Sequence, residues 1–109
     1  MSIRVAAFVL LAACAAPGKQ LPRTAITDPG ELLFNGYAKP DVTCYKCHNG
    51  DGTGTKRAPA LATRVPKLTD DQLRTVILEG RGKMPAWRKH LTDDEVAQLT
   101  VFLRARFGR

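Results

Sequence analysis

The sequence Cys44-Tyr45-Lys46-Cys47-His48 places two cysteines and a histidine within one short segment. Three kinds of chemistry use cysteines at this spacing. The pair can close a disulfide, it can bind a metal together with the histidine, or both thiols can form thioether bonds to a haem whose iron the histidine then ligates. The other segments of the chain decide among these interpretations.

The N-terminus has the composition of a secretory signal peptide over residues 1–13. Arg4 gives a positive start, and the apolar run that follows is too short to span a bilayer. The run ends in Leu11-Ala12-Ala13-Cys14, which resembles the lipobox of bacterial lipoproteins, so Cys14 is the expected lipidation site. An ordinary signal peptide is the alternative, because Ala13-Cys14-Ala15 also fits a small-x-small cleavage pattern.

A lipidated Cys14 predicts a protein of the cell envelope that faces the periplasm from a membrane. No Asp follows this cysteine, which favours the outer membrane. Residues 14–27 show no apolar periodicity and contain Pro17, Gly18 and Pro22. They are predicted to form a flexible tether that could reach about 45 Å. The folded domain is predicted to occupy residues 28–109, without a transmembrane helix.

Cysteine usage favours the haem interpretation. The chain contains three cysteines, and lipid at Cys14 with haem at the motif uses all of them. A disulfide within the motif would leave His48 as a coincidence and an odd cysteine in an exported chain. Zinc would need His90 as a further ligand, but this lone histidine is expected at the surface. A thioredoxin-like site needs nearby strands, and no alternating apolar pattern is present.

The chain is basic, with a formal net charge of +7 that falls to +6 when residues 1–13 and their single Arg are removed. Such a surface favours acidic partners or anionic surfaces. The Lys and Arg residues are spread along the chain without interleaved aromatic residues. We therefore expect redox proteins with acidic docking surfaces as partners, and no nucleic acid.

Three segments carry the signals that begin helices. The fold class is predicted to be all-α, with three main helices and long loops wrapped around one haem. Between Tyr37 and Lys67 only a short turn at the Cys-x-x-Cys-His motif is expected to be regular. The three helix starts are Asp28-Pro29-Gly30-Glu31, Thr69-Asp70-Asp71-Gln72 and Thr92-Asp93-Asp94-Glu95.

Met84 is the only methionine after the initiator, and it lies in Gly82-Lys83-Met84-Pro85 between two predicted helices. Haem iron that only transfers electrons has an axial ligand on each face, commonly His with Met. His48 and Met84 are therefore the predicted iron ligands.

The order of these motifs resembles that of the single-haem class I cytochromes c, the small bacterial kind. The resemblance covers about residues 28–107. It is carried by the attachment motif, the glycine-rich stretch 49–54, Ala58-Pro59-Ala60-Leu61, Met84-Pro85 and the segment Leu99 to Leu103.

The resemblance implies further roles. The carbonyl of Pro59 would accept a hydrogen bond from the His48 ring nitrogen that is not on iron. Trp87 would pack near the haem edge or its propionates, with simple core packing as the alternative. The chain departs from the family in placing Phe34 and Tyr37 unusually far before the first motif cysteine. Residues 36–43 therefore look like a small insertion, and which aromatic fills the crossing of the first and last helices stays open.

These features predict a monohaem, six-coordinate electron carrier that works as a monomer and is not an enzyme. If Met84 does not bind, the alternative is a haem sensor or peroxidase-like protein with an open iron position. A small zinc-binding domain is the remaining alternative.

Overall fold

The computed structural model describes residues 17–108. No strand occurs in this range, and two isolated bridges, Thr55–Ala58 and Arg81–Met84, mark tight turns. None of the helices in this range is long and apolar enough to cross a bilayer. The all-α prediction is confirmed. The elements are η1 (Arg23–Ala25), α2 (Pro29–Phe34), α3 (Tyr45–His48), α4 (Leu61–Arg64), η2 (Val65–Lys67), α5 (Asp70–Glu79) and α6 (Asp93–Phe107).

Local capping chemistry begins the three main helices at the predicted positions. Helices α5 and α6 begin at capping boxes, in which the N-cap threonine and the third helical residue exchange hydrogen bonds. Helix α2 begins at Asp28, whose carboxylate accepts from the N–H of Gly30 at 2.8 Å. Glu31 does not complete a box there. Its nearly buried carboxylate pairs instead with Arg106 of α6 at 3.2 Å. The residue that the sequence indicated as part of a helix cap therefore makes a contact between two helices.

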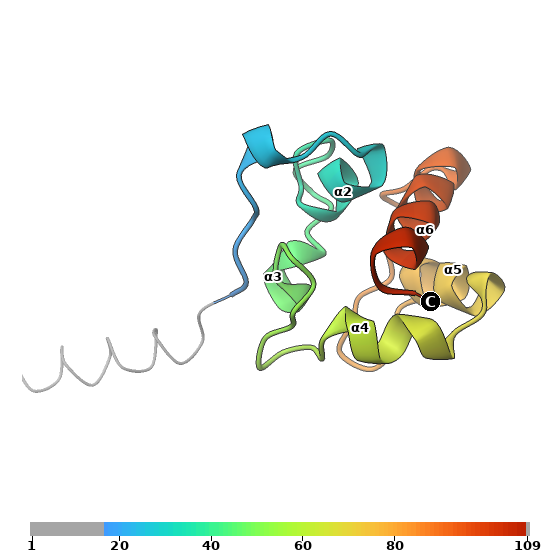
Figure 1. The fold of residues 1–109 in the computed structure, drawn as a ribbon. Coiled ribbons are helices and arrows are strands. Elements are labelled where there is room, and N and C mark those ends of the chain that lie inside the picture. Colours follow the sequence, from blue (N-terminus) through green and yellow to red (C-terminus); the bar gives the residue numbers. More distant parts are fainter. Residues whose placement is uncertain (1–16, 109) are drawn as a thin grey trace, which may run out of the picture.

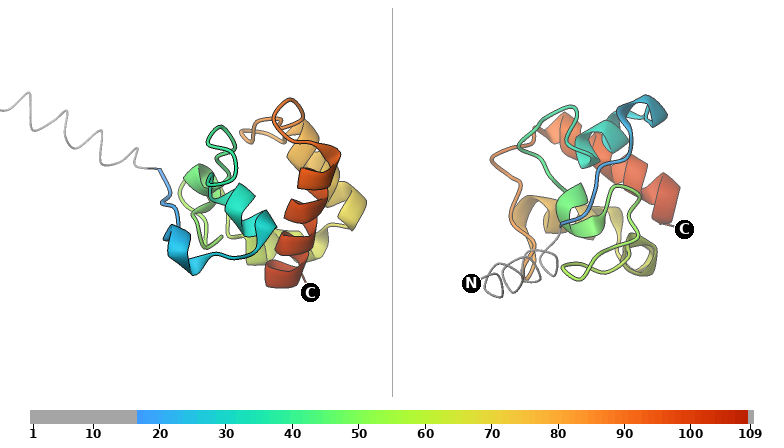
Figure 2. Two further views of the ribbon diagram at one scale, coloured as in Figure 1. Left: turned by 90° about the horizontal axis from the view of Figure 1, so that it is seen from above. Right: turned by 90° about the vertical axis from the view of Figure 1, so that its left-hand side faces the viewer.

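Helices α2 and α6 cross closely, as two views of the fold show (Figures 1 and 2). At the crossing, a Cβ on Gly30 would lie 2.3 Å from the carbonyl oxygen of Gln98, so only glycine allows this approach. Phe34 packs on Phe102 of α6 with ring centroids 5.9 Å apart. Phe34 therefore fills the crossing that the sequence left open.

One apolar core joins α2, α4, η2, α5, α6 and the loops that carry Val42, Trp87 and Leu91. Helices α5 and α6 pack side by side, while α4 and η2 close the end of the molecule nearest the C-terminus (Figure 1). The α4–η2 segment was not expected from the sequence, and it forms because Leu61 and Val65 reach the core. The buried core residues are Leu33, Phe34, Val42, Leu61, Val65, Leu73, Ile77, Trp87, Leu91, Val96, Leu99, Phe102 and Leu103.

The segment 18–26, which we call the N-terminal strap, lies within the stretch that was predicted to be a tether. It was expected to belong to a flexible tether, yet it lies against the domain and ends in Ile26, which is 2% exposed. The strap makes its contacts with the domain mostly through backbone groups. Its sequence therefore carries no helical or alternating pattern of apolar side chains that could have predicted them. In the described structure, residues 18–21 and Ile26 make contacts with the domain. The predicted signal peptide and Cys14 lie outside the described residues.

Candidate functional site

The motif cysteines and histidine lie on the short helix α3, for which Cys44 is the N-cap. Neither Cys44 nor Cys47 is in a disulfide. Cys44 packs against the apolar core, and burial raises the pKa of its thiol to about 12. Reactive redox thiols have a lowered pKa. Cys44 therefore lacks the character of a thioredoxin-like nucleophile.

The imidazole of His48 faces the interior of the domain. Its ring lies beside Phe34, with centroids 6.3 Å apart. Among the described residues its buried Nδ1 makes no hydrogen bond of acceptable geometry. Burial lowers the pKa of His48, while the carbonyl of Pro59 acts in the opposite direction. The Pro59 carbonyl is therefore close to the ring but not well aligned with it, and burial favours the neutral imidazole, the form that binds metals.

The loop after α3 folds back and brings Pro59 to the histidine. The Gly54 N–H donates to the His48 carbonyl at 2.8 Å, and the Thr55 hydroxyl donates to the Cys47 carbonyl at 2.7 Å. Gly54 has φ +87°, and a Cβ there would lie 2.8 Å from Ala58 O, Ala60 N and Pro59 C. Glycine thus permits the close return of this loop.

Met84 is held in a separate tight turn. The backbone groups of Arg81 and Met84 exchange hydrogen bonds of 3.1 and 2.9 Å. Three residues later, the Trp87 N–H donates to the carbonyl of Ile77 on α5 at 3.1 Å. The half-buried Met84 side chain packs against the same core as Cys44. The fold therefore brings the two predicted ligand-bearing segments to one apolar cluster.

No group of three or more His, Cys, Asp or Glu side chains within residues 17–108 could hold a metal ion. His90, the extra zinc ligand considered from the sequence, binds Asp41 through Nδ1 at 2.6 Å instead. The zinc interpretation therefore lacks a site in the described part of the chain. Two open depressions lie on either side of Val101 on α6, and neither is lined by a motif residue or Met84.

Comparison with known proteins decides the family. The family model described as "Cytochrome C oxidase, cbb3-type, subunit III" matches residues 28–103, most of the chain. The chain belongs to the cytochrome c family.

Individual relatives agree with this assignment. Cytochrome c-555 of Methylococcus capsulatus is 33% identical over 108 residues, covering 96% of this chain and 84% of that protein. The cytochrome c subunit of the alcohol dehydrogenase (quinone) of Gluconobacter oxydans is 34% identical over 79 residues, covering 60% of this chain but only 16% of that protein. The crystal structure of the c-type cytochrome XoxG from Methylobacterium extorquens AM1 matches with a TM-score of 0.56 and 28% identity, over 71% of this chain and 51% of that chain.

Membership of the cytochrome c family establishes covalently bound haem c, with its iron, as the cofactor. Small cytochromes c of this kind are electron carriers rather than enzymes. The site fits such a group. Both motif thiols are free, His48 lies beside them on the same short helix, and Met84 packs against the same core as Cys44.

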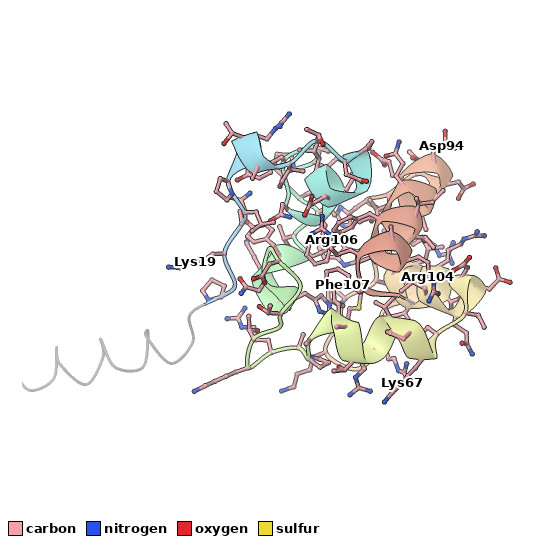
Figure 3. All side chains as sticks on the ribbon, viewed as in Figure 1. Lys19, Lys67, Asp94, Arg104, Arg106 and Phe107 are labelled. Carbon is pink, nitrogen blue, oxygen red and sulfur yellow. The ribbon has the colours of Figure 1, made fainter. Side chains whose placement is uncertain are left out.

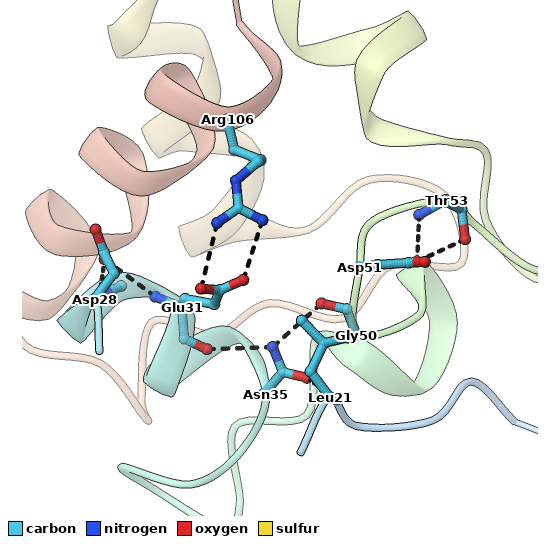
Figure 4. Close-up of polar contacts among 9 residues, drawn as sticks. Leu21, Asp28, Glu31, Asn35, Gly50, Asp51, Thr53 and Arg106 are labelled. Carbon is cyan, nitrogen blue, oxygen red and sulfur yellow. Dashed lines mark hydrogen bonds and ion pairs between the residues drawn. The ribbon is translucent and has the colours of Figure 1, made fainter. Parts of the chain in front are cut away.

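Asn35 is a supporting residue of this cytochrome that the sequence did not reveal. It is fully buried, and Figure 4 shows its amide joining distant segments. Oδ1 accepts from the Leu21 N–H at 2.8 Å, and Nδ2 donates to the carbonyls of Glu31 at 3.3 Å and Gly50 at 3.2 Å. Asn35 thus fixes the strap, α2 and the loop after α3 in register. An Asn just after a helix usually indicates only a turn, so no local signal marked it.

The predicted insertion, residues 36–43, also supports the site. The Lys39 ammonium donates to the His90 carbonyl at 3.0 Å and to Glu95 at 2.7 Å. Together with the Asp41–His90 contact, these bonds form a brace between the insertion and the chain that follows Met84. The hydrogen bond to His90 is the main reason that the pKa of Asp41 is lowered.

Trp87 lies between the brace and the core. It is 9% exposed and belongs to the core cluster. Its ring meets that of His90 edge-on, with centroids 5.7 Å apart. Core packing is thus observed for Trp87, and its expected place near a haem edge stays a prediction.

Proposed function

We propose that this cytochrome is a monohaem, six-coordinate, single-electron carrier. Cys44 and Cys47 would form the two thioether bonds to haem, and His48 and Met84 would ligate its iron. Bound in this way, haem supplies an iron centre that alternates between the ferrous and ferric states. The observation that carries the proposal is that the side chains of Cys44, the N-cap of α3, and Met84 both pack against the same apolar core.

The protein residues hold and shield the group rather than react. The Pro59 carbonyl orients His48 and raises its basicity as a ligand. Helices α2, α5 and α6 supply the apolar side chains that exclude water, which favours a rigid site of low dielectric. Met ligation raises the reduction potential relative to a second His. These properties suit rapid electron exchange without a bound substrate.

The carrier docks transiently, as a monomer, on redox proteins with acidic surfaces. Charge on the two loops around the site supports this proposal. Residues 52–69 contain four Lys or Arg and no acid, and residues 80–92 likewise contain basic residues and no acid. These loops carry Pro59 and Met84. A positive field there steers acidic partners toward the site.

Cys14 is proposed to carry the lipid that anchors the carrier in the bacterial cell envelope. The domain then faces the periplasm, where bacterial c-type cytochromes are typically found, and the outer membrane is favoured because no Asp follows Cys14. Replacing Cys14 with Ser is expected to release the cytochrome from membranes in a soluble form. Retention of the variant in the membrane fraction would show that Cys14 does not carry the lipid anchor.

Ligation is tested by Met84→Ala, with Lys83→Ala as the matched control in the same turn. Loss of the sulfur ligand is expected to change the oxidised visible spectrum and to lower the reduction potential by more than about 59 mV, a tenfold shift for one electron. Lys83→Ala is expected to change neither the spectrum nor the ligation. An unchanged spectrum and potential for Met84→Ala would refute the assignment and favour an open iron position in the wild type.

A further inference from the structure

The N-terminal strap is docked directly on the helix that bears the attachment motif. The N–H of Gly18 donates to the Lys46 carbonyl at 2.7 Å. The N–H of Lys19 donates to Asn49 Oδ1 at 3.0 Å, and the Lys19 carbonyl accepts from Gly50 N–H at 2.8 Å. Three hydrogen bonds therefore fix the start of the strap to α3 and to the residues just after it.

Close packing specifies this docking as well. A Cβ built on Gly18 would lie 2.2 Å from the Tyr45 carbonyl oxygen and 2.9 Å from Asn49 Cα. Both atoms belong to backbone that cannot move without disturbing α3. Any residue other than glycine would therefore push the strap away from the attachment helix.

The remainder of the strap is also fixed. The Leu21 carbonyl accepts from the Tyr37 hydroxyl at 2.6 Å, and its N–H donates to the buried amide of Asn35. The last strap residue, Ile26, is buried. The strap is therefore fixed to the domain at residues 18–21 and buried at Ile26, so it adds no free reach to an N-terminal anchor.

This docking shortens the link between the lipid and the haem-attachment helix. Only residues 15–17 separate Cys14 from Gly18. Fully extended, the chain from Cys14 to Gly18 spans about 14 Å, against about 45 Å for a tether that ran to Thr27. We propose that the lipid anchor holds Gly18, and with it the end of α3 on which the strap is docked, within about 14 Å of the membrane surface. This inference rests on the lipid anchor of the proposed function.

Charge near the anchored end agrees with this orientation. The side chains of Lys19 and Lys46 are exposed, and the Lys46 carbonyl accepts from the N–H of Gly18, the residue before Lys19. Lys19 projects outward at the end of the domain where the described chain begins (Figure 3). Lysines this close to a lipid anchor are attracted to anionic headgroups. The membrane-facing side of the domain is thus the side that carries α3.

The distance is measured on the full, lipidated, haem-loaded protein in vesicles of phosphatidylethanolamine and phosphatidylglycerol. A fluorescent label on a lipid headgroup is quenched by energy transfer to haem, and the efficiency falls steeply with distance. Ten Gly and Ser residues inserted between Ala16 and Pro17 add roughly 17 Å of average reach. A second variant, Gly18→Val, releases the start of the strap, and Thr24→Val places the same side chain at an exposed strap position as the control.

The insertion is expected to lower the transfer efficiency at least twofold. Gly18→Val should lower it in the same direction, and Thr24→Val should leave it unchanged. If the insertion, which lies outside the folded domain, leaves the efficiency of the membrane-bound protein unchanged, the short-tether inference is wrong while the anchor stands. If the wild-type protein is recovered free of membranes, the anchor and this inference are both wrong.

Discussion

Gly54 and Gly82 have similar backbone conformations but different surroundings. Their φ angles are +87° and +58°, in the region that side chains rarely adopt. A Cβ on Gly54 would strike the backbone of the Pro59 segment at 2.8 Å, whereas a Cβ on Gly82 would meet nothing within 4 Å. Substitutions at these two glycines therefore separate the cost of backbone strain from the cost of disturbing the close approach that brings Pro59 to His48.

Replacing Gly54 with Ala is expected to destabilise the haem-loaded cytochrome more than Gly82→Ala does. Strain alone costs about 1–3 kcal/mol at each position, and only Gly54→Ala must also displace the Pro59 loop. Urea unfolding followed by far-UV circular dichroism measures both variants. Equal losses of unfolding free energy would mean that the Gly54 contact does not hold Pro59 in place.

At the level of single residues, the sequence indicated the candidate haem-binding residues better than it indicated the residues that hold the surrounding segments in place. The sequence predicts Cys44, Cys47 and His48 as haem-binding residues, because covalent attachment imposes a fixed local spacing. Asn35 was not, because its three hydrogen bonds join segments far apart in the chain. Residues whose role is defined by distant partners leave no local pattern.

At the level of elements, the insertion 36–43 has a structural role. It contributes to the brace formed by Lys39, Asp41, His90 and Glu95. The brace joins this loop to the chain after Met84 and to the start of α6. The insertion therefore contributes to the position of the Met84 turn, although it lies before the motif in sequence.

The brace has a predictable pH dependence. In the folded protein the pKa of Asp41 is lowered from its usual value of 3.8, mainly by the hydrogen bond with His90. A carboxyl with a lowered pKa stabilises the fold above the unfolded pKa, and this stabilisation is lost as the pH falls through the folded pKa. Asp41→Asn should therefore lower the urea midpoint at about pH 5 to 6 but have progressively less effect below about pH 4.

His90→Gln is the matched control, because it removes the partner of the same hydrogen bond. In that background Asp41→Asn is expected to have no further effect on the urea midpoint. A stability difference between wild type and Asp41→Asn that persists unchanged to the lowest pH would contradict the role of this pair.

Helices with their own capping chemistry were predicted from the sequence, and segments held only by distant contacts were not. The boxes at Thr69 and Thr92 begin α5 and α6. By contrast, α4 is four residues long, has no side-chain cap and depends on core burial of Leu61. The strap likewise depends on backbone contacts with α3 and on Asn35. Packing rather than propensity stabilises such elements.

For the whole molecule, the haem is expected to be part of the core. A domain of about 90 residues buries a marginal core by itself. Several apolar side chains pack against the core while staying partly exposed, and a large apolar group could cover them. These side chains are Cys44, Leu68, Leu78, Met84 and Phe107.

Replacing both Cys44 and Cys47 with Ala is therefore expected to leave an unfolded chain. Far-UV circular dichroism and thermal melting are the measurements, and Cys14→Ala is the control, since the third cysteine is not part of the attachment motif. A haem-free double variant that melts cooperatively would show that the polypeptide core suffices without the cofactor.

The most direct test of the central claim is the visible absorption spectrum of the purified protein, reduced and oxidised, before and after denaturation in acid. The proposed ligation predicts one haem that stays bound to the denatured chain, and a six-coordinate spectrum with a methionine–iron band in the oxidised native protein. A protein without haem absorption, a haem that dissociates in acid, or a spectrum of open iron would contradict it.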